Sequence, residues 1–195
     1  MHLIGRITLL QIQRASLKAG ERPHSYYDPA PLLGLPSLRL TPDGAIGQPP
    51  GGDPIVDVHN ASHPHSEDVH GKNGISIGFT SHYQAMRERF GPHLTDGCAG
   101  ENIVVAAERV LTLADLGGEL AIVGHDGRSA RLGALVVAAP CVEFSRFANF
   151  AAEPLSPDEL RATLQFLGEG MRGFYARLAE AEAEVKAGDL VYRVE

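Results

Sequence analysis

ENIVVAAERVLTLADLGGELAIVGHDGRSARLGALVVAAP, residues 101–140, consists of short aliphatic runs separated by Gly and Asp residues typical of turns. The runs ENIVVA, RVLTL, ELAIVG and ALVVAAP are rich in β-branched and other aliphatic side chains, which favours strands. Short strands at this spacing favour a barrel or a sandwich over parallel βαβ units. The sequence therefore predicts a mainly β protein.

Segments on both sides extend this pattern. Residues 3–12 predict a first strand, residues 38–47 a strand with a Pro-Asp-Gly turn and a short return, and residues 54–60 another short strand. The final segment GDLVYRVE, residues 188–195, alternates as a half-buried strand does. Residues 178–188, LAEAEAEVKAG, have high helix propensity but lie between strand-like segments, so strand and helix both stay open there.

Two helices are expected beside the strands. Residues 81–90 begin with Ser81 and Gln84 at the spacing of a capping box, and their apolar side chains share one helical face before a Gly-Pro pair. Residues 156–171, SPDELRATLQFLGEGM, open with Ser, Pro and Glu in the order of a capping box with proline at the first helical position. An apolar stripe then continues along this second helix.

The composition is that of an ordinary folded domain. The chain has 195 residues, of which 44% are hydrophobic and 21% are charged. That apolar content is enough for one core at a length that suits one domain. We therefore expect residues 1–195 to form a single domain.

Charge, cysteine content and hydropathy limit the function classes. Seventeen Lys and Arg against 24 Asp and Glu give a net charge of −7, and no basic run could neutralise a line of phosphates, so nucleic acid is not an expected partner. Two cysteines are too few for a disulfide scaffold. No stretch approaches the roughly 20 apolar residues needed to cross a bilayer, and the N-terminal segment lacks the features of a signal peptide. We expect a cytoplasmic protein that does not bind membranes.

One of the two cysteines, Cys141, directly follows the apolar run that ends at Pro140. Because proline cannot donate to a strand ladder, the strand is expected to end there and to place Cys141 at the rim of the sheet. A rim thiol with Arg146 nearby can have a lowered pKa, and only the thiolate acts as nucleophile, sulfur acceptor or metal ligand. Burial as a small hydrophobic residue is the alternative.

Two further segments carry polar groups that could serve a site. In GCAGENIVV, residues 97–105, the glycines allow a tight turn that places Glu101 and Asn102 at the mouth of the following strand, although a plain hairpin turn would look the same. The segment MRGFYARL contains Arg172 and Arg177. A guanidinium that faces a pocket can bind phosphate with two hydrogen bonds, but arginine on an exposed strand face is commoner.

These segments occur in the order GENI, a strand ending in Pro-Cys, RGFYAR, and then Val-x-x-Gly-Asp. In this combination they resemble the MOSC domain family, named for the C-terminal domain of molybdenum cofactor sulfurases. The resemblance covers residues 79–195 most strongly, with residues 1–78 as N-terminal strands and loops of the same barrel. It implies a mainly β, barrel-like fold with a few peripheral α-helices.

The resemblance also implies roles for individual residues. Cys141 matches the characteristic cysteine of the family, which is thought to accept sulfur as a persulfide or to ligate molybdenum. Glu101 and Asn102 occupy the family's Glu-Asn turn, and Arg177 its basic position after the aromatic pair. These three residues are the expected binding residues for a cofactor, which by the resemblance would be the molybdenum cofactor, a molybdopterin.

The chain departs from the family's usual pattern in its N-terminal half. Many members carry a Gly-Asp-Arg-His-like stretch, whereas the nearest segment here, GGDPIVDVHNASHPH, keeps only the Gly52-Asp53 pair of it. A chain of 195 residues also has no room for the pyridoxal-phosphate domain of a full sulfurase. Sulfur would therefore come from a partner such as a cysteine desulfurase, and a molybdoenzyme is the expected acceptor.

A group of histidines follows this segment. It comprises His59, His63, His65 and His70. Imidazoles spaced in this way could hold zinc, with Asp57 or Asp68 completing the ligand set. Solvated or hydrogen-bonded loop histidines are commoner, so the sequence assigns no metal ligand.

The sequence supports three functions, which follow in descending order of support. The first is a MOSC-domain protein that handles sulfur or the molybdenum cofactor through Cys141, which would extend to reduction of N-hydroxylated compounds, as in some family members. The second is a non-catalytic module that binds a small anion or a partner protein. The third is a metal-dependent hydrolase that uses the histidine loop.

Overall fold

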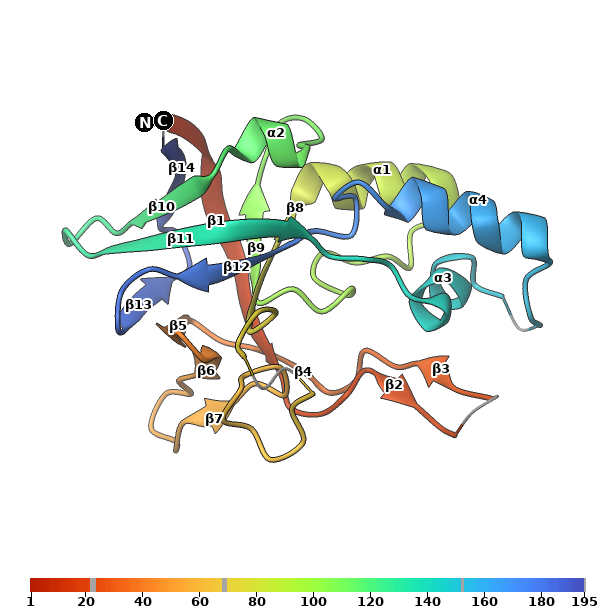
Figure 1. Ribbon diagram of the computed structural model, residues 1–195, viewed down its shortest axis with the longest axis horizontal. Coiled ribbons are helices and arrows are strands. Elements are labelled where there is room, and N and C mark those ends of the chain that lie inside the picture. Colours follow the sequence, from red (N-terminus) through yellow and green to blue (C-terminus); the bar gives the residue numbers. More distant parts are fainter. Residues whose placement is uncertain (22–23, 68–69, 152, 195) are drawn as a thin grey trace.

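The centre of the molecule is a closed barrel of seven strands (Figure 1). The computed structural model describes residues 1–21, 24–67, 70–151 and 153–194. Around the barrel the strands are β1 (His2–Gln13), β14 (Leu190–Val194), β10 (Glu119–Val123), β11 (Ser129–Val137), β12 (Phe174–Leu178), β8 (Ile75–Phe79) and β9 (Ile103–Ala106). Only β8 and β9 run parallel; the other barrel pairs are antiparallel. The predicted mainly β, barrel-like fold is confirmed.

The long first strand closes the barrel. The beginning of β1 pairs with β14, with His2 opposite Arg193, and its middle pairs with β9, with Leu10 opposite Ile103. Its last residues pair with β4 (Leu32–Gly34). Both chain ends therefore lie together at one end of the barrel (Figure 1), and closure leaves the barrel strands without free edges.

A smaller sheet covers one end of the barrel. Its strands, in spatial order, are β13 (Ala183–Lys186), β5 (Ser37–Thr41), β6 (Gly44–Gly47) and β7 (Ile55–Val56). Leu38 and Val185 face each other across β5 and β13 and are buried in the same hydrophobic core as the barrel side chains. Burial of Val185 explains why the helix-prone residues 178–188 contain a strand, since tertiary packing outweighs intrinsic propensity.

Helices form a second layer beside the barrel. Figure 1 shows α1 (Thr80–Phe90) and α4 (Pro157–Leu167) on one side, with α3 (Val142–Ala148) and the hairpin of β2 (Lys18–Ala19) and β3 (Tyr26–Tyr27) below them. A second hydrophobic core lies between these elements and includes Tyr27, Tyr83, Phe144 and Leu167. The predicted capping box of α4 is present, with Ser156 as N-cap residue. This layer holds one wall of the candidate site described below.

Two local predictions are wrong. The run RVLTL does not form a strand: Thr112 caps the short helix α2 (Leu113–Leu116) through a capping box with Asp115, which favours a helical turn over extension. The predicted capping box at the start of α1 is also absent. The helix begins one residue earlier, and the Ser81 hydroxyl instead donates a hydrogen bond to the Arg109 carbonyl at 2.7 Å.

The apolar run before Cys141 is not buried on both faces. In β11, Leu132 and Leu135 face the core while Val136 is 48% exposed. An irregularity in the pairing with β12 between Gly133 and Val136 shifts the alternation of inward and outward side chains. The strand ends at Val137, and the chain then leaves the barrel toward the helical layer.

Candidate functional site

Cys141 lies where the chain passes from β11 into α3. It is the N-cap residue of this helix in an extended conformation, and its Sγ accepts a hydrogen bond from the Phe144 amide at 3.4 Å. The side chain is half-buried and lines a small pocket of about 80 Å³. Such a volume holds only a few water molecules.

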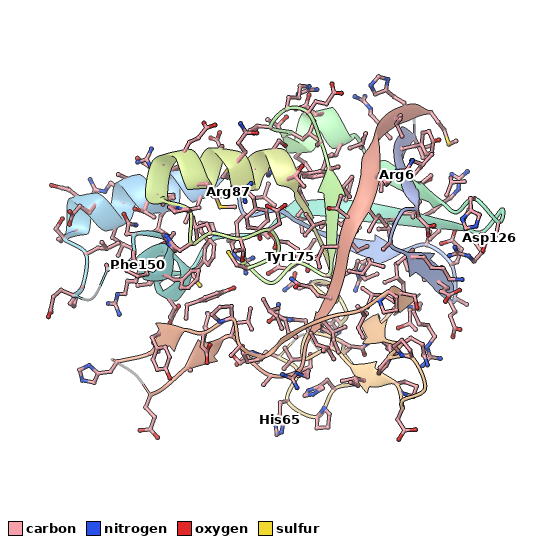
Figure 2. All side chains as sticks on the ribbon, turned by 180° about the vertical axis from the view of Figure 1, so that it is seen from behind. Arg6, His65, Arg87, Asp126, Phe150 and Tyr175 are labelled. Atoms are coloured by element: carbon pink, nitrogen blue, oxygen red, sulfur yellow. The ribbon has the colours of Figure 1, made fainter. Side chains whose placement is uncertain are left out.

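The pocket lies between the barrel, the β2–β3 hairpin and the helical layer. Its chemically important lining residues are Lys18, Tyr27, His59, Glu101, Cys141 and Arg172. Tyr175 of β12 also lines it, and Figure 2 shows this residue near the middle of the molecule. The structure thus brings Cys141 and Glu101, two of the four expected site residues, to one pocket.

Glu101 is held in a tightly fitted and almost completely buried position. Tyr83 donates a hydrogen bond of 2.5 Å to its carboxyl group, and the same hydroxyl accepts from the Ala99 amide. A Cβ atom at Gly78 would come within 2.8 Å of the Glu101 carboxyl oxygen, so any side chain at that position would displace the carboxyl group. Burial raises the pKa of Glu101, although the nearby Arg172 and the Tyr83 hydrogen bond act in the opposite direction.

Arg172 supplies positive charge to the same pocket. Its Nη2 donates to the Ala99 carbonyl at 2.8 Å, and its guanidinium lies 5.8 Å from the centre of the Phe144 ring. Its buried Nε has no hydrogen-bond partner among the described residues. Burial opposes the charge, but the surrounding acidic groups, Tyr175 first among them, raise the pKa of Arg172. The guanidinium is therefore a permanent cation with spare donor capacity.

Asn102 follows Glu101 in sequence but points away from the pocket into a buried hydrogen-bond network. Its Oδ1 accepts from both the amide and the hydroxyl of Ser76, each at 3.0 Å. Its Nδ2 donates to the Gln11 carbonyl at 3.3 Å and to Asp57 at 2.9 Å. Both ends of the amide are thus engaged within the protein, where they connect β1, β8 and the loop after β7.

The other arginines considered from the sequence lie outside the pocket. Arg177, on β12, donates from its guanidinium to the backbone carbonyls of His70 and Gly71. Arg146, on α3, lines a neighbouring groove of about 850 Å³. Arg172 is consequently the arginine that faces Cys141, and a cofactor role for Arg177 stays a prediction.

The second cysteine has a different environment. Cys98 is only 4% exposed and packs in the core beneath the helices. Burial, followed by the charge of Glu101, raises the pKa of Cys98 well above that of an ordinary thiol. Both cysteines are free thiols, but Cys98 lacks the open surface that reaction requires.

The histidines of the loop after β7 do not converge. Within residues 1–21, 24–67, 70–151 and 153–194, no three His, Cys, Asp or Glu side chains are grouped as metal ligands would be. His65 lies at the edge of the molecule, away from Tyr175 (Figure 2), and His63 accepts a hydrogen bond from the His65 amide. Asp68 lies outside the described residues. The geometry therefore gives the hydrolase hypothesis no support.

Comparison with known proteins settles the family. The model of the MOSC domain matches residues 66–192. The chain belongs to the MOSC domain family. Among solved structures, the YuaD protein from Bacillus subtilis has a TM-score of 0.62 at 15% identity, covering 97% of this chain and 94% of that one. YiiM from Geobacillus stearothermophilus has a TM-score of 0.53 at 17% identity, covering 100% of this chain and 75% of that one.

These likenesses show that the MOSC fold is shared, and the family is associated with functions of the molybdenum cofactor sulfurase type. No curated protein sequence matches the chain. No helix among the described residues of this MOSC domain has the length and apolar character that crossing a bilayer requires.

The sequence did not indicate that His59 lines the pocket of this MOSC domain, or that Asp57 lies buried next to His59. Asp57 is fully buried, and His59, two residues later, lines the pocket with Cys141. Gly52 and Asp53, the nearest counterpart to the family's Gly-Asp stretch, are both exposed. An aspartate directly after a short strand, with a histidine two residues on, was the available signal, but these residues were considered only as possible zinc ligands, and no metal ligand was assigned.

The buried carboxyl of the MOSC pocket gives a test by pH. Because the pKa of Glu101 is raised in the folded state, its stabilising contribution is fully present below the ordinary pKa of glutamate and is lost as the pH rises through the raised value. Glu101→Gln keeps an oxygen for the Tyr83 hydroxyl and cannot ionise. We expect the wild type to lose stability relative to this variant as the pH rises over that interval, as measured by urea unfolding. The same pH dependence in both proteins would contradict the assignment.

Proposed function

We propose that this MOSC domain is a sulfur carrier in which Cys141 receives a sulfur atom as a persulfide and passes it on. A cysteine desulfurase is the proposed donor, and a molybdoenzyme or its cofactor is the proposed acceptor. The observation that carries the proposal is that Cys141 is half-buried on the wall of a small pocket that Glu101 and Arg172 also line. Among the described residues that line the pocket, Cys141 is the only one that can form an S–S bond.

The surroundings of Cys141 support transient sulfur binding. Arg172 lies on the same pocket and keeps its positive charge, so it stabilises a negatively charged thiolate or persulfide. Glu101 has a raised pKa because it is buried, which reduces its repulsion of such an anion. The pocket therefore offers positive charge to a sulfur anion bound at Cys141.

The described residues do not fit an enclosed molybdenum cofactor. Pockets for ligands of that size have about 300 to 1,000 Å³, whereas the Cys141 pocket has about 80 Å³. The larger groove beside it shares Tyr27 and offers Arg146 to a phosphate, but it is also lined by Glu143 and Glu153, whose charges oppose an anionic pterin. The proposed chemistry therefore uses sulfur alone.

The transfer step balances without an external oxidant. The Cys141 thiolate attacks the outer sulfur of the donor persulfide, so that a new S–S bond forms on Cys141 while the donor's S–S bond breaks. The donor cysteine leaves as a thiolate and takes up the proton that Cys141 lost. A donor persulfide and a Cys141 thiol thus become a donor thiol and a Cys141 persulfide.

The experiment is sulfur loading combined with metal analysis. Protein from a molybdenum-replete host is incubated with a cysteine desulfurase and L-cysteine and then examined by intact mass. We expect a gain of one sulfur atom and no stoichiometric molybdenum in the protein as purified. Stoichiometric molybdenum without sulfur uptake would instead support a cofactor-bound enzyme, and anion binding that is unaffected by alkylation of Cys141 would support the binding module.

A further inference from the structure

Asp57 and His59 form a fixed pair beside the Cys141 pocket, which the His59 side chain lines. The Asp57 carboxylate accepts hydrogen bonds from the Gln13 amide at 2.7 Å, from Asn102 Nδ2 at 2.9 Å and from the His59 amide at 2.8 Å. The Nδ1 atom of His59 lies 3.2 Å from the same Asp57 oxygen that the His59 amide binds. Asp57 is fully buried, so its position is set by the barrel and not by the loop.

This arrangement determines which nitrogen of His59 is available. A carboxylate only accepts hydrogen bonds, so the contact with Asp57 places a proton on Nδ1. In the neutral ring Nε2 is then the free acceptor. The His59 side chain is 41% exposed and lines the pocket together with Cys141. Because the pocket has room for only a few water molecules, a small ligand bound in it would lie close to both side chains.

We propose that His59 is the acid–base catalyst of sulfur transfer at Cys141 and that Asp57 is its positioning residue. The inference rests on the proposed sulfur-carrier function. His59 Nε2 takes the proton from the Cys141 thiol, directly or through one water, as Sγ attacks the outer sulfur of the donor persulfide. The imidazolium then gives this proton to the departing donor thiolate. The ring is neutral again at the end, and the bonds made and broken are those of the transfer step above.

Other ionisable groups around Cys141 are less suited to this role. They are Lys18, Tyr27, Glu101, Glu143, Arg172 and Tyr175. Burial raises the pKa of both Tyr27 and Glu101, and Arg172 stays a cation. The Tyr27 hydroxyl already donates to the Cys98 carbonyl, and the Glu101 carboxyl already accepts from the Tyr83 hydroxyl. Lys18 is paired with Glu143 at 3.8 Å. Burial opposes ionisation of Glu143, but its own backbone amide, Ser25, Lys18 and the Cys141 thiol lower its pKa, which makes it a weak base.

The test compares His59→Gln with His63→Gln. Glutamine at position 59 can still donate a hydrogen bond to Asp57 but cannot carry a proton between two sulfur atoms. His63 belongs to the same loop and does not line the pocket, so its variant is the matched control. The first readout is the rate at which a desulfurase persulfide loads Cys141. We expect a loss of about 100-fold in His59→Gln and no change in His63→Gln.

The second readout does not depend on sulfur transfer. The rate of Cys141 alkylation by iodoacetamide, followed on the Cys141 peptide, is measured against pH. We expect Cys141 to be alkylated more slowly in His59→Gln than in the wild type, since glutamine cannot accept the thiol proton. Folded Asp57→Asn protein should show a change in Cys141 alkylation in the same direction as His59→Gln.

The outcomes separate this inference from the proposed function. If His59→Gln loads sulfur at the wild-type rate and has the wild-type alkylation profile, the role of His59 is wrong while the sulfur carrier stands. If the wild type takes up no sulfur but its alkylation profile depends on His59, the sulfur carrier is wrong and the coupling between imidazole and thiol stands.

Discussion

Cys141→Ser is expected to abolish sulfur transfer while the protein stays folded. Serine is a preferred N-cap residue, so its hydroxyl replaces the thiol as acceptor for the Phe144 amide at the start of α3. Serine cannot form a persulfide, and removal of a nucleophile costs a reaction several orders of magnitude. We expect the rate of sulfur delivery to an acceptor to fall by at least about 1000-fold, with an unchanged circular dichroism spectrum.

Cys98→Ala is the matched control for this change. Cys98 is buried, and the hydrogen bond it receives from the Tyr27 hydroxyl ends on its backbone carbonyl, which the substitution keeps. The control should therefore retain sulfur transfer. Loss of transfer in Cys98→Ala together with full activity in Cys141→Ser would show that Cys98, and not Cys141, carries the sulfur.

Asn102→Ala is expected to have the largest effect on stability. The substitution removes all four hydrogen bonds of the buried amide and leaves the Ser76 amide and Asp57 without one of their partners. Unsatisfied buried polar groups cost about 1 to 3 kcal/mol each. We expect the free energy of unfolding in urea to fall by about 3 kcal/mol or more.

Asn149→Ala provides the comparison for this stability effect. Its amide donates to the Ser145 carbonyl and to the Thr163 hydroxyl at the edge of the helical layer. These bonds are partly exposed, so their loss should cost about 1 kcal/mol. An equal and small effect of both substitutions would show that the Asn102 network does not hold the barrel to the loop after β7.

The strands and the capped helix could be predicted because their signals are local. The aliphatic runs that became β9, β10 and β11 alternate with turn residues, and Ser156 with Glu159 forms the expected box. The sequence could not decide between a strand and a helix at β13, because the strand forms there through the packing of Val185 against Leu38. Barrel closure itself is a long-range property of β1 and β14.

The candidate site was only partly accessible to sequence reasoning. The position of Cys141 after a strand and that of Glu101 before one could be read from the sequence, but their meeting depends on the way the barrel closes. Arg172 and Arg177 look equivalent in RGFYAR, yet a hydrogen bond to Ala99 holds Arg172 at the pocket while Arg177 turns to the loop after β7. The partners of Asp57 come from distant segments of the chain, so no local pattern could reveal its role.

The most direct test of the account is the position of the transferred sulfur. Wild-type protein is incubated with a cysteine desulfurase and L-cysteine, persulfides are trapped by alkylation, and the peptides that contain Cys141 and Cys98 are compared by mass spectrometry. We predict one additional sulfur on the Cys141 peptide and none on the Cys98 peptide. A Cys141 peptide that is alkylated as a plain thiol, under conditions in which the desulfurase itself carries a persulfide, would contradict the account.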